Sequence, residues 1–376
     1  MKLISTIITI MLIATLSACD GHDMPVQHAD NHEYISFSAQ PQKTATRANP
    51  YEAYDPLRHP ATIGTFGYYD MPKRYASAAN TIFSNETATY NASTSSWDTA
   101  TKKRWAEYPK ASSFDFFAYM PYTDGATLLR NANNTYTLSF PFAMSDGGDP
   151  VPVIYDTKAA PIICAVPGSK GAISDSNGGG TVSLKFDQTL TGYRLLFMLG
   201  TKMNAIRHFR IKSVTLSGSF STSCTISRSY VWNTASKSWS ASAITWSDIK
   251  RQSFVETPFP IAYKSYGTAD YDDNTRTAIV TSADYTQWGA DFYTIPDAEF
   301  LPVITVKYDV EFIAEDGTTI ITRKNVTSGI TINKDNFSSL TTGKTATISP
   351  IRILIQPRYL YVLADEDAYT GHLLID

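Results

Sequence analysis

The chain has 376 residues, with 32 Lys and Arg against 35 Asp and Glu, so its formal net charge is −3. This near-neutral balance does not indicate a nucleic-acid partner or a basic membrane-binding patch. Aromatic residues make up 12% of the chain, led by 23 Tyr. That composition favours β-structure, because Tyr, Thr, Val, Ile and Phe fit a pleated, half-buried surface. The length is sufficient for two domains of ordinary size.

The N-terminus has the three parts of a secretory signal peptide over residues 1–18. Lys2 supplies the positive charge, an apolar stretch follows from Ile4 to Leu16, and Ser17-Ala18 precede Cys19. The apolar stretch is too short for a spanning helix, which needs about 20 residues. Leu-Ser-Ala-Cys resembles the lipobox of bacterial lipoproteins, which predicts acylation (palmitate) of Cys19 rather than an ordinary buried cysteine. Several acyl chains on Cys19 would anchor the protein to the cell outer membrane.

A polar, acidic segment follows over residues 19–33 and is predicted to be a flexible tether. Three His lie in it, but their irregular spacing makes a metal site the weaker interpretation (His22, His28 and His32).

Alternating apolar and polar runs begin after the tether and recur at the spacing of a β-sandwich. A Thr-rich linker containing Pro, residues 41–50, separates the first run from the second. The runs in the first half of the chain are 34–38, 63–69, 114–119, 135–142 and 152–155.

Gly178-Gly179-Gly180 ends a long polar insertion and is the best candidate for a domain boundary. Asp316-Gly317 lies between two alternating runs and predicts a hairpin there. The later runs are 182–186, 193–199, 211–216, 303–312 and 318–323. No stretch after the signal peptide shows sustained helical periodicity, so the predicted fold is all-β.

The C-terminus consists of strand-like pieces that continue to the last residues. These pieces are 351–355, 359–363 and 372–375. Chain ends usually fray, whereas an end rich in strand-forming residues usually pairs with another strand.

No catalytic motif is present: the chain has no Gly-x-Ser-x-Gly elbow, His-Glu-x-x-His, phosphate loop or Cys-x-x-Cys. We therefore expect no enzyme activity, no cofactor and no metal. Asp270 to Asn274 could supply oxygen ligands to calcium, but the segment lacks the Gly and distal Glu of an EF-hand loop, which favours a solvated acidic turn. His59, His208 and His372 have no acidic or nucleophilic companion at a telling spacing.

Two further groups have structural and functional interpretations. Cys164 and Cys224 are far apart in sequence, which is more typical of unpaired core residues than of a disulfide. Four Trp could form a platform on which sugars stack, although packing within a β-domain is their commoner use (Trp232, Trp239, Trp246 and Trp288).

The order of these features resembles the fimbrillin family, the lipoprotein precursors of protease-assembled (type V) pili. Four places over most of the mature chain support the resemblance. They are the lipobox at Cys19; Thr46-Arg47-Ala48 with the Gly-rich aromatic strand 64–69; Trp105 and Tyr108-Pro109 leading into 114–122; and 182–186 followed by 211–218 and 340–344. The chain departs from the family at Asp187-Gln188, where relatives often carry a His, and at Phe292 to Asp297, which match only in part.

The resemblance implies two tandem transthyretin-like β-sandwich domains, here over residues 34–177 and 178–376. It also implies assembly by strand replacement, in which an Arg-specific surface protease removes an N-terminal strand and a neighbouring subunit's C-terminal strand takes its place. In this chain the removable strand would be residues 34–39 and the cut would lie between Arg47 and Ala48, with Arg58 or Arg74 as alternative sites. The donor strand would be Tyr359, Leu360, Tyr361, Val362 and Leu363.

The expected function is therefore that of a surface-exposed fimbrium subunit that contributes to adhesion, with other subunits, the outer membrane and the processing protease as partners. The alternative is a surface lipoprotein that binds glycans through exposed aromatic residues. A surface hydrolase has no support from the motifs. Within the pilus class, an anchor must keep Cys19 attached, a stalk subunit must lose it, and a tip subunit need not donate a strand. The C-terminal strands mildly favour a stalk or anchor role.

Overall fold

The structure is a computed structural model that describes residues 33–39, 60–70, 80–110, 112–131, 134–155, 161–173, 179–200, 207–258, 271–272, 277–280, 286–297, 301–313, 319–332, 348–356 and 372–375. The described residues confirm the all-β prediction, since the one helix that lies wholly within them is a single 3₁₀ turn, η2 (Trp105–Glu107). No helix in this part of the chain is long and apolar enough to cross a membrane.

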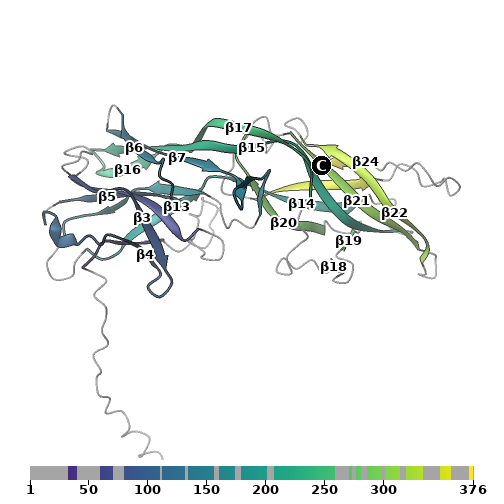
Figure 1. The fold of residues 1–376 in the computed structure, drawn as a ribbon, viewed down its shortest axis with the longest axis horizontal. Coiled ribbons are helices and arrows are strands. Elements are labelled where there is room, and N and C mark those ends of the chain that lie inside the picture. The colour runs from purple at the N-terminus through teal and green to yellow at the C-terminus, as the bar shows by residue number, and fades with distance from the viewer. Residues whose placement is uncertain are drawn as a thin grey trace, which may run out of the picture.

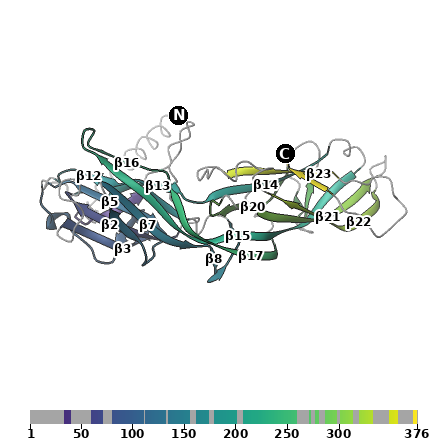
Figure 2. The same cartoon turned by 90° about the horizontal axis from the view of Figure 1, so that it is seen from above.

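The molecule is elongated and has two lobes, which Figures 1 and 2 show from two directions. Two long strands, β15 (Arg207–Asn233) and β17 (Thr245–Pro258), run from one lobe into the other. At about 3.3 Å per residue, the 27 residues of β15 span roughly 90 Å.

The first lobe contains a sheet that closes on itself. β11 pairs with β13 on one side and with β5 on the other, so the sheet order β11-β13-β1-β4-β3-β2-β5 forms a barrel. β12 (Gly168–Lys170) continues the β11 side and pairs with β5 as well. The barrel strands are β1 (Ser36–Ala39), β2 (Thr62–Tyr69), β3 (Thr81–Asn91), β4 (Ser96–Thr99), β5 (Phe114–Met120), β11 (Ile162–Val166) and β13 (Val182–Gln188).

β5 is buried on both faces, which explains why its sequence is apolar without alternation. Phe114, Phe116 and Met120 belong to the core inside the barrel, whereas Phe117 and Tyr119 belong to a second core outside it. Other large contributors to the interior core are Phe37, Phe83, Trp97, Trp105, Leu184 and Phe186.

A cover sheet packs on the outer face of β5 and encloses the second core. β7 is its clearest strand, because inward Tyr136, Leu138 and Phe140 alternate with outward residues, as the sequence pattern predicts. The sheet consists of β6 (Thr127–Arg130), β7 (Thr135–Ala143), the C-terminal half of β15, β16 (Ser238–Ala241) and the first half of β17.

The second lobe is a two-sheet sandwich around a separate core that includes Trp288, Ile351 and Ile353. One sheet has the order β10-β20-β14-β23-β24 and the other contains β18-β19-β15-β21-β22. These strands are β10 (Ile154–Tyr155), β14 (Thr191–Leu199), β18 (Tyr271–Asp272), β19 (Thr277–Val280), β20 (Thr286–Thr294), β21 (Leu301–Ile313), β22 (Thr319–Thr331), β23 (Ile348–Gln356) and β24 (His372–Ile375).

The lobes meet where β15 exchanges one neighbour for another. Its pairing with β21 ends at Ser219, and its pairing with β7 begins at Ser223. Between them, the Ser221 hydroxyl donates to Asp297, which also accepts a bidentate pair of bonds from Arg251 at 2.7 and 2.9 Å. The short hairpin of β8 (Ser145–Asp146) and β9 (Asp149–Pro150) projects from this waist (Figure 2).

The strand predictions are confirmed in the described residues, except that only Ile154 and Tyr155 of the run 152–155 form a strand and that the run 34–38 forms one only from Ser36. β15 is much longer than the predicted 211–216, and β21 and β22 form the predicted antiparallel pair, although Asp316-Gly317, where the turn is predicted, lies outside the described residues. The division at 177/178 stays a prediction. The strands near it enter different lobes, since β13 belongs to the barrel while β10 pairs with β20.

Candidate functional site

The candidate site is the place of β1 in the barrel wall. This four-residue strand lies between β4 and β13, antiparallel to the first and parallel to the second. Phe37 has Trp97 as its partner on β4 and Val182 as its partner on β13. Residues 1–32 and 40–59, which flank this segment, lie outside the described residues. Seven described residues from the N-terminal region therefore complete the wall.

An aromatic cage inside the barrel holds the Phe37 side chain. The Phe37 ring meets Phe83 at 5.9 Å and Phe116 at 5.5 Å between centroids, both edge to face. Phe37 is 0% exposed, and Ile35, two residues earlier, points into the same core. Edge-to-face pairs add about 0.5–1.5 kcal/mol each to the burial of the rings. The cage therefore favours an aromatic side chain at this position.

Gly67 makes the cage possible. A Cβ at this position would lie 2.8 Å from the Phe116 ring and 2.9 Å from the Phe83 ring. The Gly-rich aromatic run that the sequence shows at 64–69 is thus needed for close packing around the site. Gly64 has the same role on the other face of the wall, where a Cβ would lie 2.2 Å from the Tyr119 ring.

A cationic rim surrounds the point where the chain enters β1. The Arg104 guanidinium donates to the Tyr34 hydroxyl at 3.2 Å and pairs with Glu33 at 3.2 Å. The Lys102 ammonium lies 5.3 Å from the centre of the Tyr34 ring. The Tyr34 hydroxyl first, and the Glu33 charge second, raise the pKa of Arg104 above its ordinary value. The half-exposed Arg104–Glu33 pair positions the strand but contributes little to overall stability.

Backbone hydrogen bonds extend this entrance. Ile35 N–H donates to the Lys103 carbonyl at 2.9 Å, and Trp105 N–H donates to the Glu33 carbonyl at 3.1 Å. On the outer side of the strand, the Ser36 hydroxyl lies 3.2 Å from the hydroxyl of Thr181. The strand is thus held through its backbone, its interior face and its outer face.

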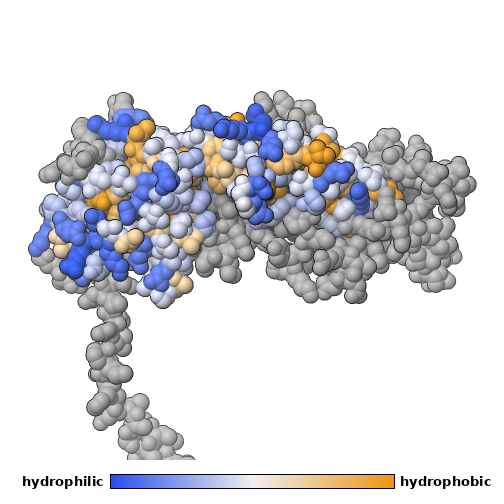
Figure 3. All heavy atoms as spheres, in the orientation of Figure 1, coloured by the Kyte–Doolittle hydropathy of each residue, from blue (hydrophilic) through white to orange (hydrophobic). Residues whose placement is uncertain are grey.

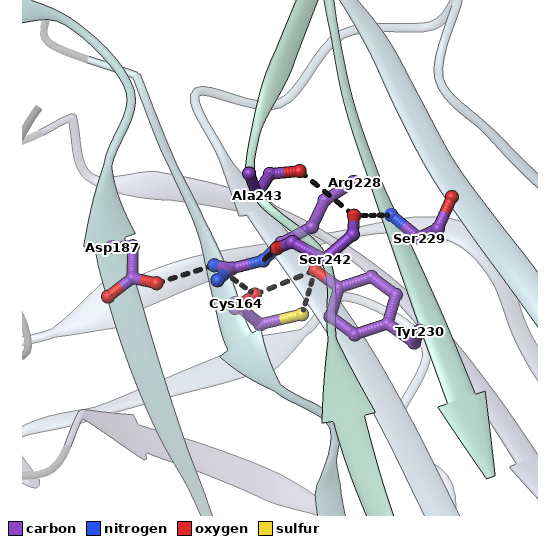
Figure 4. A network of polar contacts seen from close by, with 7 residues as sticks. All are labelled: Cys164, Asp187, Arg228, Ser229, Tyr230, Ser242 and Ala243. Carbon is purple, nitrogen blue, oxygen red and sulfur yellow. Dashed lines mark hydrogen bonds and ion pairs between the residues drawn. The ribbon is translucent and has the colours of Figure 1, made fainter. Parts of the chain in front are cut away.

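A polar network next to the site joins the barrel to the cover sheet (Figure 4). Arg228 on β15 donates to Asp187 on β13 at 2.5 Å and to the Ser242 carbonyl at 3.0 Å. The Tyr230 hydroxyl donates to the Cys164 carbonyl at 2.7 Å and lies 3.0 Å from the Cys164 sulfur. Asp187 therefore serves as the anion of this cross-layer pair.

Burial favours the protonated forms of the thiol and the phenol in this network. It raises the pKa of the Cys164 thiol and raises the pKa of the Tyr230 hydroxyl well above its ordinary value. Burial likewise raises the pKa of Cys224 to about 12. Both cysteines are free and buried, and a thiol kept protonated is a poor nucleophile.

The residues predicted to carry lipidation, cleavage and donation all lie outside the described residues, as do most of the candidate cation ligands. Of the acidic segment 270–274, only Tyr271 and Asp272 are described, as β18. Among the described residues, no group of three or more His, Cys, Asp or Glu is placed to hold a metal. The predicted positions outside the description are Cys19, His22, His28, His32, Arg47, Ala48, Tyr359, Leu360, Tyr361, Val362 and Leu363.

The four Trp of the sugar-stacking interpretation do not form one platform. Trp288 is 2% exposed in the core of the second lobe. Trp239 donates to Asp115 at 2.8 Å, and Trp246 donates to the Thr189 carbonyl at 3.1 Å, so both are fixed against the second core. Trp232 is half-buried and packs edge to face on Trp239 at 5.3 Å.

The exposed surface has few apolar residues. Figure 3 shows them on one face as small separate spots among hydrophilic residues. The large apolar side chains exposed in the described part of the chain are Leu129, Val231 and Val255. Scattered residues of this kind are usual on soluble domains and do not define a binding patch.

Sequence reasoning identified the β1 strand but missed its surroundings. The parallel pairing with β13 and the closure through β11 join residues far apart in sequence, and no local pattern signals them. The basic run Lys102-Lys103-Arg104 could have been noticed as a signal for the rim, because it follows the polar turn after β4.

Comparison with known proteins gives distant similarities only. No known family model and no curated protein matches the chain. It is similar to crystal structures of proposed cell adhesion proteins from Bacteroides uniformis (11% identity, 91% of this chain, 97% of that chain, TM-score 0.32) and Bacteroides ovatus (11%, 92%, 96%, 0.37). It is also similar to a proposed polysaccharide binding protein from Bacteroides thetaiotaomicron (9%, 86%, 90%, 0.30). Identities and TM-scores this low carry no inference about this chain.

Proposed function

We propose that this protein is a structural subunit of a cell-surface fimbrium, that it contributes to adhesion and that it has no enzyme activity. It would be exported and anchored in the outer membrane through lipid on Cys19. An Arg-specific surface protease would cut between Arg47 and Ala48 and so free β1 to leave. The C-terminal strand of a neighbouring subunit, residues 359–363, would then fill the vacated place.

The position of β1 is the observation that supports this proposal. β1 is the first described strand, it has only four residues, and it lies between two strands that come from later in the chain. Cutting the chain after residue 39 would leave it bound only by non-covalent contacts. A short strand completing a wall made by the rest of the chain is well suited to replacement by β-augmentation.

Loss of β1 would leave a groove that favours the binding of a new strand. The backbone groups of β4 and β13 that now face β1 would lose their partners, and unpaired edges recruit further strands. Burial of Ile35 and Phe37 contributes on the order of 1.5–3 kcal/mol each, and an incoming strand recovers that burial with its own apolar side chains. An open groove of this kind is therefore stable only when it is filled.

The role within the fimbrium would depend on whether the N-terminal tether is cut off. A subunit that is cut at Arg47 loses Cys19 and can serve as a stalk, whereas an uncut subunit stays attached to the membrane and can serve as an anchor. The alternative of a glycan-binding lipoprotein is less favoured, because Trp239, Trp246 and Trp288 are engaged in the cores.

Limited proteolysis of the lipid-free chain with an Arg-specific protease tests the proposal. N-terminal sequencing should find a new terminus at Ala48, and gel filtration should then show oligomers that resist detergent. R47A should abolish both results, whereas the matched variant R58A should behave like the parent. A chain that is cut at Arg47, loses β1 and stays monomeric would contradict strand exchange.

A further inference from the structure

The groove that β1 fills does not itself determine the direction of the strand inside it. β1 runs antiparallel to β4 and parallel to β13, so these two walls have opposite directions relative to any strand between them. A replacement strand that ran the other way would also form one parallel and one antiparallel ladder. The backbone pairing therefore has nearly the same quality in both directions, and side chains must decide between them.

Two features of the groove discriminate among side chains. The cage of Phe83 and Phe116 accepts an aromatic ring at the position of Phe37. The rim at the position of Glu33 and Tyr34 presents Lys102 and Arg104. When β1 leaves, Glu33 leaves with it, whereas Glu107, which accepts from the Arg104 backbone N–H at 3.1 Å, stays beside the rim. The empty rim is then cationic.

The C-terminal segment of a second copy meets these requirements in only one direction. With Tyr361 in the cage, a strand running as β1 does would place Arg358 at the Tyr34 position, against two cations. A strand running the opposite way would place Ala364 there and Asp365 at the Glu33 position. The next two residues, Glu366 and Asp367, add further negative charge at the same rim.

We propose that the donor strand from a second copy enters this groove opposite in direction to β1, with Tyr361 in the aromatic cage and Asp365 to Asp367 at the Lys102–Arg104 rim. This inference rests on the proposed function, because it concerns the strand that replaces β1. Lys102 and Arg104 would then have two successive roles: they hold Glu33 and Tyr34 before cleavage and select the donor's acidic end afterwards. Like charges at the rim would disfavour the other direction.

The exchange also changes the volume on the outer side of the strand. β1 presents Ser36 and Ser38 there, whereas the donor would present Val362 and Leu360 in either direction, in opposite order. These two positions are neighbours of Asp98 on β4 and Ser183 on β13, respectively. The pairing at Asp98 and Ser183 therefore reports the direction directly.

Disulfide trapping tests the direction in the lipid-free chain after Arg-specific cleavage. In the proposed direction, oxidation should link subunits in D98C/V362C and in S183C/L360C. The same acceptor cysteines with exchanged donors, D98C/L360C and S183C/V362C, should not link. The parent, whose Cys164 and Cys224 are buried, is the background control.

The linked pairs separate the two hypotheses. Links in the exchanged set would overturn the direction but leave strand exchange intact. Growth of oligomers without links in either set would overturn the register with Tyr361 in the cage. A parent that loses β1 and stays monomeric would overturn both strand exchange and the proposed direction.

A charge swap tests the role of the rim. K102E/R104E should slow oligomer growth roughly tenfold at low salt, because rim charges act mainly on the rate of association, and the difference should shrink at high salt. Adding D365K/E366K/D367K to the same chain should restore the rate. Equal growth of the parent and K102E/R104E, or no restoration by the swap, would overturn selection by the rim.

Discussion

The two lobes solve the problem of sheet edges in different ways. In the first lobe the wall closes, since β11 pairs with both β13 and β5, and a four-residue strand then has a neighbour on each side. The second lobe is an open sandwich, and among the described residues one of its sheets ends at the short strand β24, which pairs there with β23 alone. β1 and β24 each have four residues. β1 is needed to close the wall of the first lobe, whereas β24 only extends the edge of an open sheet.

Because β1 closes the wall, truncating a buried side chain of β1 should lower the free energy of unfolding more than any other single truncation proposed below. F37A removes a ring that is 0% exposed and opens the cage, so we expect it to lower the free energy of unfolding by about 3–5 kcal/mol. S38A, one residue further and half-buried, should change it by less than about 0.5 kcal/mol. Urea unfolding followed by Trp fluorescence measures both values.

Amide hydrogen exchange sharpens the same prediction. F37A should speed exchange in β4 and β13 and leave β23 protected, whereas I353A, which truncates a side chain that is 0% exposed in the core of the second lobe, should do the reverse. Equal loss of protection in both lobes would show that β15 couples the cores into one cooperative unit.

The network between barrel and cover sheet should be the next most sensitive feature. R228M leaves Asp187 mostly buried and without its charge partner, and breaking a buried pair in this way costs about 3 kcal/mol. R104M removes a half-exposed pair and is the matched control. Its urea midpoint should stay close to that of the parent. A midpoint for R228M that also equals the parent's would mean that water solvates the Asp187 carboxylate.

Adding a methyl group to the closely packed wall should lower the free energy of unfolding by a smaller amount. The Cβ of G64A would overlap the Tyr119 ring, whose hydroxyl is held by Asn85 at 2.7 Å and by the Thr123 carbonyl at 2.8 Å. Overpacking should therefore lower the free energy of unfolding by about 1–3 kcal/mol. G171A, with no atom within 4 Å of its Cβ, should show no such loss. Thermal unfolding of both variants in the same buffer measures the difference, and equal midpoints for G64A and G171A would contradict the predicted overpacking.

These residues also show which parts of the fold the sequence could predict. The alternation over 135–142 predicted β7, because one face of that strand is buried and the other is solvated. β15 was predicted over only six of its residues, because Gly218, Thr222 and Arg228 occupy inward positions and interrupt the apolar pattern. β1 was predicted as a strand, but its neighbours could not be, because register between distant strands depends on tertiary packing.

The smallest predicted effect concerns pH and lies at the junction of barrel and cover sheet. Asp115 on β5 is 2% exposed, and its Oδ1 accepts from the Ser169 hydroxyl at 2.6 Å and from Trp239 Nε1 at 2.8 Å. Its Oδ2 is buried with no hydrogen-bond partner among the described residues. Desolvation raises the pKa of Asp115 above its ordinary value, and nearby Asp70 adds to the rise.

The sign of the effect follows from the raised pKa. The folded state holds the proton of Asp115 more tightly than the unfolded state, so the stabilisation is complete below the ordinary Asp pKa of about 3.9 and is lost as pH rises through the folded value. D115N cannot titrate, so its free energy of unfolding relative to the parent should rise over that window and level off above it. Subtracting the two urea curves at each pH removes the contribution of the other carboxylates. A difference that is flat across the window, or that falls, would show that the Ser169 and Trp239 hydrogen bonds outweigh desolvation, so that the fold accommodates the charge between barrel and cover sheet.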